Sequence, residues 1–205
     1  MSAPITIRWL GHASYKITKG STSIVLDPFA PGSVPGFREI RETANLVLCS
    51  HGHHDHNYTD AVTLQPNDAP AFTITKIETY HDNAHGTKRG PNTIHVLESD
   101  GIRIVHFGDL GCALTDEQKN ILRGADVVLI PVGGFYTIDA VQAKAIIDEI
   151  KPKVAIPMHY RTDRFGLSAI APLDDFLALC DAPVLLEKNT FTVGEVASGI
   201  VVLKY

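Results

Sequence analysis

The feature that most constrains the fold is a run of histidines at residues 51–56, His-Gly-His-His-Asp-His, directly after the apolar segment 46–49. Alternate residues of an extended segment project to the same side, so His51 and His53 can bind one metal ion. Asp55 and His56 start one residue out of phase and can face a neighbouring ion. A surface histidine tract that binds metal adventitiously is the alternative. Because a predicted buried strand leads into the run, we expect a built site with two metal positions.

The composition excludes several classes of protein. At 205 residues and 44% hydrophobic content the chain predicts one domain, residues 1–205. Its apolar stretches are shorter than the ~20 residues of a membrane helix, and no export signal is predicted. A net charge of −5 disfavours nucleic acid as a partner, and we expect a small-molecule substrate instead. Three well-separated cysteines predict neither disulfides nor a thiolate zinc site, which favours the cytoplasm. The oligomeric state is not predicted.

Short strands and a few helices are expected along the chain. The predicted helices cover 38–43, 115–123, 139–150 and a segment that starts at Pro172. The predicted strands cover 5–10, 14–18, 23–26, 46–49, 71–79, 93–98 and 102–107. Residues 28–36, which hold three prolines and two glycines, predict a loop. Short strands that end in polar loops are typical of folds in which ligands bind at the carboxyl ends of strands.

The pattern His-x-His-x-Asp-His after an apolar strand resembles the signature of the metallo-β-lactamase superfamily. The resemblance implies an α+β fold, an αββα four-layer sandwich with two mixed β-sheets flanked by helices. It continues along the chain in the segments Leu-Asp27-Pro, Tyr-His81-Asp-Asn, Phe-Gly-Asp109-Leu and Met-His159-Tyr. By this resemblance the first metal is held by His51, His53 and His81, and the second by Asp55, His56 and His159. Asp109 would contact both ions.

Three further segments are similar to a small bacterial branch of metal-dependent hydrolases related to ascorbate-6-phosphate lactonase. They are Trp9-Leu-Gly-His12-Ala-Ser, Arg89-Gly-Pro-Asn and Gly133-Gly-Phe-Tyr136-Thr. Relatives in this branch include lactone and phosphodiester hydrolases. The resemblance therefore implies a dinuclear hydrolase of a small, anionic ester, lactone or phosphodiester. The alternative is a non-hydrolytic metal-binding, redox or regulatory protein on the same fold.

Two divalent metal ions are the expected cofactors. Zinc is the first metal expected, and manganese and iron are the alternatives, because ligands that are all nitrogen or oxygen do not distinguish between these metals. A hydroxide held between two such ions is nucleophilic at neutral pH. Asp55 is expected to orient that hydroxide or carry its proton, and His12 to act at the site mouth as an acid or substrate contact. Asp27 is expected to fix the tautomer of a ligand histidine. Substrate contacts are expected from Arg89, Tyr136 and Arg161.

Overall fold

Alternating apolar side chains in the first strand set up the interior. The structure is a computed structural model, and it describes residues 3–65 and 71–205. In strand β1 (Ile5–Gly11) every second residue is buried, as the two-residue period of a strand with one solvated face requires. Ile5, Ile7 and Trp9 belong to one apolar cluster that lies between two β-sheets.

The first sheet has five strands in the order β13-β1-β2-β3-β5. Its other members are β2 (Ser14–Lys19), β3 (Thr22–Leu26), β5 (Leu46–Leu48) and β13 (Thr190–Thr192). The pairs β13 with β1, β1 with β2, and β2 with β3 are antiparallel, whereas β3 and β5 are parallel. Strands β1, β3 and β5 therefore run in one direction.

The second sheet has seven strands in the order β12-β14-β11-β10-β9-β8-β7. They are β7 (Thr73–Tyr80), β8 (Pro91–Ser99), β9 (Ile102–His106), β10 (Val127–Pro131), β11 (Val154–Met158), β12 (Val184–Leu185) and β14 (Gly199–Val202). From β9 to β12 neighbouring strands are parallel, and the β7-β8-β9 meander is antiparallel. Strands β10 and β11 are buried along their whole length, as expected for parallel strands covered on both faces.

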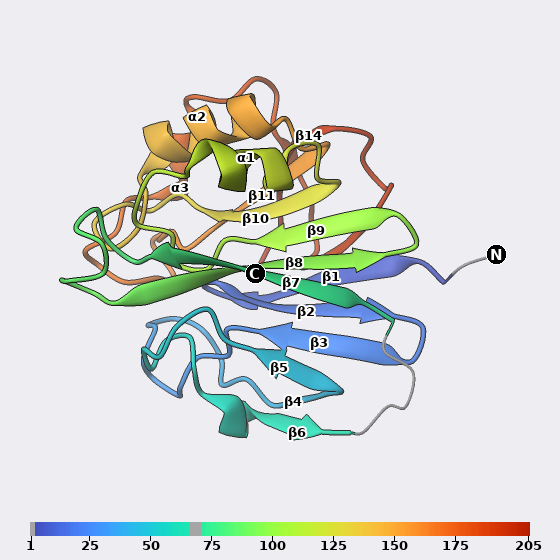
Figure 1. The fold of residues 1–205 in the computed structure, drawn as a ribbon. Helices are drawn as coiled ribbons and strands as arrows, with labels where there is room; N and C mark the ends of the chain where they lie inside the picture. The colour runs from blue at the N-terminus through green and yellow to red at the C-terminus, as the bar shows by residue number, and fades with distance from the viewer. Residues whose placement is uncertain (1–2, 66–70) are drawn as a thin grey trace.

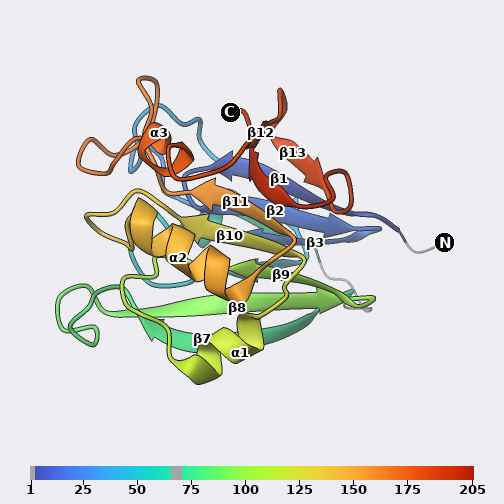
Figure 2. The ribbon, with the colours of Figure 1, turned by 90° about the horizontal axis from the view of Figure 1, so that it is seen from above.

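Helices cover the outer face of the seven-stranded sheet (Figure 1, Figure 2). They are α1 (Asp116–Leu122), α2 (Ala140–Ile150) and α3 (Leu173–Leu177). Helix α1 begins with a capping box between Thr115 and Gln118, as predicted, and α2 begins with one between Asp139 and Gln142. The helix predicted from Pro172 is shorter than those two, with five residues.

The five-stranded sheet is covered on its outer face by a small two-stranded ribbon (Figure 1). The ribbon pairs β4 (Glu42–Ala44) with β6 (Val62–Leu64), and the 3₁₀ helix η1 (Thr59–Ala61) precedes β6. A second apolar cluster, which includes Val25, Phe29 and Ile40, fills the space beneath it. The expected α+β sandwich of two mixed sheets is confirmed. Over the five-stranded sheet, the described residues form a two-stranded ribbon and a single 3₁₀ turn.

The helix predicted over 38–43 is wrong. Residues 38–41 have no regular structure and β4 begins at Glu42. Contacts distant in sequence override the local preference, because the carboxylate of Glu42 accepts hydrogen bonds from Arg8 (2.6 Å) and Lys16 (3.1 Å) on β1 and β2. The backbone N–H of Arg38 donates to the Tyr205 hydroxyl (2.8 Å), and the side chain of Ile40 packs into the second cluster.

The strand directions bring seven loops to one edge of the sandwich. Because β7 and β9 through β11 share one direction, and β1, β3 and β5 share theirs, the loops that follow these strands gather at the left of Figure 1. This edge holds the histidine run. Within the described residues, no helix is long and apolar enough to cross a membrane.

Candidate metal centre

The predicted metal ligands, together with His12 and Asp27, lie after the carboxyl ends of strands. His12 follows β1, Asp27 follows β3, and residues 51–56 follow β5. In the second sheet His81 follows β7, Asp109 follows β9 and His159 follows β11. The two sheets therefore contribute side chains to a common site at their shared edge, although these residues span almost 150 positions of the sequence.

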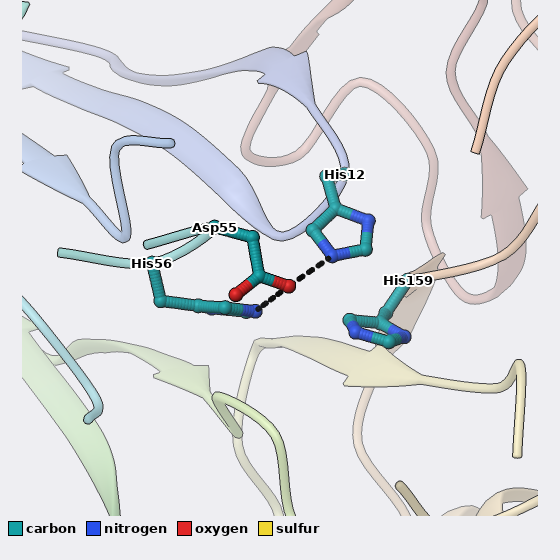
Figure 3. Close-up of side chains that lie close together, drawn as sticks. All are labelled: His12, Asp55, His56 and His159. Carbon is teal, nitrogen blue, oxygen red and sulfur yellow. Dashed lines mark ion pairs between the residues drawn. The ribbon is translucent and has the colours of Figure 1, made fainter. Parts of the chain in front are cut away.

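Two groups of ligand-capable atoms match the predicted metal positions, and a third, Asp27 with His51 and His56, overlaps both. His51, His53 and His81 form one group, in which the donor atoms lie within 4.8 Å of one another. His12, Asp55, His56 and His159 form the other, by the same measure. Figure 3 shows these four side chains pointing toward one another, with an Asp55 oxygen 3.5 Å from His12 Nε2 and 3.6 Å from His56 Nε2. The structure thus gathers the predicted ligands into two positions and adds His12 to the second.

The carboxylate of Asp109 lies between the two groups. Its Oδ2 is 3.3 Å from Nε2 of His81 in the first group. It is 3.2 Å from Nε2 of His56 and 3.2 Å from Nε2 of His159 in the second. Asp109 is fully buried, so this oxygen is in reach of ions at either position.

A buried hydrogen-bond network orients His51 and His56. Asp27 Oδ2 accepts from His56 Nδ1 (2.8 Å) and from the Ser50 hydroxyl (2.5 Å), and Oδ1 accepts from the Ser50 backbone N–H (2.6 Å). Since the single hydroxyl proton of Ser50 goes to Asp27, the hydroxyl oxygen accepts from His51 Nδ1 (3.0 Å). In their neutral forms both rings carry their proton on Nδ1, which leaves each Nε2 lone pair directed at the site. Sequence reasoning missed Ser50, whose only signal is its place between β5 and His51.

The electrostatics of the site favour neutral ligand rings and charged carboxylates. Burial, with His159 nearby, lowers the pKa of His12 to about 4, and burial with His56 nearby lowers that of His51 to about 3. Burial opposes the charge of Asp27, yet the hydrogen bonds from His56 and Ser50, together with the nearby His56 and His106 rings, outweigh it and hold the pKa of Asp27 at about 2. His56 is the exception: although burial works against it, Asp109 and Asp27 raise its pKa well above the usual range.

The donor set fits metal ions. Buried ring nitrogens and carboxylate oxygens without a hydrogen-bond partner are rare in native proteins, because leaving one unpaired costs about 1–3 kcal/mol. Among the described residues such atoms concentrate here: Nε2 of His12, His51, His56 and His159, and Oδ1 of Asp109. Divalent ions would satisfy these atoms together. His53 is exposed and Asp55 half-buried, so the site opens to solvent on their side.

Unusual backbone conformations hold the site. His12, Asp27 and His159 all have positive φ (53°, 45° and 53°), a strained region that clusters at functional sites. Gly108, at φ 55°, precedes Asp109, and a Cβ there would lie 2.4 Å from the Asn92 and Ser50 side chains. Asn92 in turn accepts from the Asp109 backbone N–H (2.8 Å). Sequence reasoning missed this role of Asn92, whose partner is distant in sequence.

The predicted substrate residues differ in their surroundings. Arg89 lies over the ring of Tyr136 at 5.5 Å, so these two are brought together. Asp82, the residue after His81, holds the loop that carries Arg89. Its carboxylate accepts a hydrogen bond from the Arg89 backbone N–H (2.7 Å). Arg161 uses its Nε–H to bind the Ile170 carbonyl (2.8 Å), which anchors its own loop. His12 is predicted from the sequence to lie at the mouth of the site. It is fully buried, so it lies inside the site and not at its mouth.

Comparisons with known proteins agree with this geometry. The profile of the beta-lactamase superfamily domain matches residues 6–159. A UPF0173 metal-dependent hydrolase of Archaeoglobus fulgidus is 31% identical, over 76% of this chain and 83% of its own. One of Pelotomaculum thermopropionicum is 32% identical, over 76% and 84%. The crystal structure of a proposed Zn-dependent hydrolase of the metallo-beta-lactamase superfamily from Thermotoga maritima superposes with a TM-score of 0.76 at 34% identity, covering 97% of this chain and 98% of that one.

Proposed function

Since the chain belongs to the metallo-beta-lactamase superfamily, among its UPF0173 metal-dependent hydrolases, we propose that it is a dinuclear hydrolase of a small anionic ester, lactone or phosphodiester. The observation that carries the proposal is the convergence of two donor groups on the single carboxylate of Asp109. Two divalent ions bound there would supply a hydroxide at neutral pH and polarise an oxygen of the substrate.

Each residue then has a distinct task. His51, His53 and His81 would hold the first ion, and Asp55, His56 and His159 the second, with Asp109 shared between them. Asp27 would keep His56 directly, and His51 through Ser50, in the tautomer that binds metal. Asp55 is half-buried at the open side of the site, where its second carboxylate oxygen would orient the attacking water or accept its proton. A catalytic role for His12 stays a prediction.

An anionic substrate is supported by Arg89, in the loop that follows His81. Arg89 is half-buried, and its guanidinium lies against the Tyr136 ring with no carboxylate among its described ion-pair partners. A guanidinium held on an aromatic face keeps its N–H donors free for a phosphate or carboxylate. Tyr136 would contact the same group, whereas Arg161 would bind substrate only with the guanidinium nitrogens that do not hold Ile170.

Three further parts of the proposal come from the sequence, namely the single domain, the cytoplasmic location and the order of the candidate metals. We infer that residues 1–205 act as one domain, which is supported by a site that draws ligands from both sheets. We also keep the cytoplasm as the proposed location. Zinc remains the first metal to test, followed by manganese and iron.

The test is a hydrolysis assay on protein purified without an affinity tag, because a histidine tag binds metal itself. We expect the metal-loaded chain to hydrolyse bis(p-nitrophenyl) phosphate or a member of a small lactone panel, and a chelator to abolish the reaction. Arg89→Gln should raise KM for the anionic probe and leave kcat nearly unchanged. Lys76→Gln, an exposed cation on β7, is the matched control. A chain that binds both ions yet hydrolyses neither class of probe would support the non-hydrolytic alternative.

A further inference from the structure

His12 is an unexplained buried group beside the second metal position. Its side chain is fully buried, and neither ring nitrogen has a hydrogen-bond partner in the described structure. Its Nε2 lies 3.5 Å from an Asp55 oxygen, which is too long for a well-formed hydrogen bond. A buried imidazole with both nitrogens unpaired is costly, so it requires a partner.

The surroundings of His12 hold its ring in one place. The carbonyl of His12 accepts hydrogen bonds from the Trp9 ring N–H (3.0 Å) and from the His159 backbone N–H (3.4 Å). The His12 and His159 rings lie with their centroids 4.0 Å apart. A Cβ at Gly11 would lie 2.5 Å from the Phe37 ring, so Phe37 packs directly against the backbone that precedes His12. The chain thus uses a strained residue, at φ 53°, to place this ring among the ligands.

We propose that His12 is a fifth protein ligand of the second metal ion, so that the two metal positions are chemically unequal. The inference rests on the proposed dinuclear function. The first position has three histidines and Asp109. The second has His12, Asp55, His56 and His159 in addition to the same Asp109. Figure 3 shows that the ring of His12 enters this second group from the β1 side, opposite His56.

The inequality predicts different metal preferences. With the shared hydroxide, the first position has five ligands, which zinc accepts at catalytic sites. The second position, with five protein donors and the same hydroxide, has six, which suits an ion that favours six ligands, such as manganese or iron. The chain would then bind its two ions in separate steps, and a mixed pair of metals would form more readily than at two equal sites.

The experiment is a titration of the metal-free, tag-free chain with Co²⁺, followed by visible absorption. Co²⁺ absorbs less strongly as its ligands increase from four to six. The wild type should bind two equivalents, and the one at the first, five-ligand position should absorb more strongly than the one at the second. In His12→Asn the second equivalent should bind at least about tenfold more weakly, since even the loss of a group that supports a ligand costs about 10–100-fold. Asparagine tolerates the left-handed backbone but is too short to reach the ion.

His85→Asn is the matched control. His85 has the same left-handed backbone conformation (φ 54°), but it is exposed and outside both donor groups. This variant should bind both equivalents like the wild type. If His12→Asn also binds two Co²⁺ ions with wild-type affinity and spectrum, the role of His12 is overturned while the dinuclear site stands. If the wild type binds fewer than two ions, the proposed dinuclear function fails as well.

A measurement on the wild type keeps the inference testable if His12→Asn does not fold. In the Co²⁺-loaded protein each bound imidazole carries its other ring N–H close to a paramagnetic ion, which shifts the proton NMR signal strongly. We expect six shifted ring N–H signals, from His12, His51, His53, His56, His81 and His159. Five signals, with His12 missing, would overturn the assignment.

Discussion

Replacing Asp27 by asparagine tests how the site sets the protonation of its ligands. Asp27 is fully buried and accepts three hydrogen bonds, two from Ser50 and one from His56. Asparagine keeps the shape and tolerates the positive φ, but its NH₂ group replaces the oxygen that faces His56. The His56 ring then accepts through Nδ1 and carries its proton on Nε2, the atom that should bind the second ion.

The structure sets the size of the expected effect. Oδ2 accepts hydrogen bonds from both His56 and the Ser50 hydroxyl, and the loss of even one such bond to a charged group destabilises the metal-free protein by about 1.5–3 kcal/mol. The affinity for the second ion should fall about 10–100-fold, as for other groups that orient a metal ligand. Urea unfolding, followed by the fluorescence of the single, buried Trp9, measures the first quantity. Competition with a chromophoric chelator measures the second.

Asp126→Asn is the control for removing a buried carboxylate. Asp126 accepts a hydrogen bond from the Arg103 backbone N–H (2.8 Å) and forms an ion pair with Lys153 (2.8 Å). It precedes β10, so it lies at the ends of the strands opposite to the metal centre. This variant should lose stability and keep its metal affinity. If Asp27→Asn binds both ions as tightly as the wild type, the argument that Asp27 fixes the His56 tautomer is refuted.

Three further predictions concern the shared carboxylate, the glycine before it and the effect of pH. Asp109→Ala should lose metal loading and hydrolysis together, as measured by metal analysis and the phosphodiester assay; unchanged activity in a folded variant would count against the site. Gly108→Ala should weaken metal binding and lower the melting temperature, because its Cβ would displace Ser50 and Asn92; wild-type values for both would contradict this packing. The raised pKa of His56 means that a proton leaves when metal binds, so affinity should rise with pH through neutrality. Calorimetry in buffers of different ionisation enthalpy detects the released proton. If no proton is released, His56 does not lose a proton when metal binds.

Much of the fold could be predicted from local patterns. The strands of the β1-β2-β3 meander, the hairpin at Ser99-Asp100-Gly101 and the capped start of α1 each depend on residues close in sequence. The segment 38–43 shows the limit of such patterns, because Glu42 is fixed by Arg8 and Lys16, about thirty residues away. Helical preference there is weaker than these tertiary contacts.

The proposed ligand set could be identified from the sequence because each member stands in a distinctive motif at a strand end, and the structure brings these residues together. The supporting residues could not, since Ser50 and Asn92 are ordinary polar residues until the fold brings them to Asp27, Gly108 and Asp109. The depth of His12 was equally hidden. A histidine after a strand gives no sign of whether it faces solvent or, as here, lies buried among the ligands.

The most direct test of the account is the metal content of the tag-free chain after reconstitution and removal of free metal. Inductively coupled plasma mass spectrometry gives this ratio without any assumption about the substrate. The two donor groups around Asp109 predict close to two equivalents of metal per chain. Failure to retain any metal after reconstitution with zinc, manganese and iron in turn would contradict the central claim that these side chains form a dinuclear site.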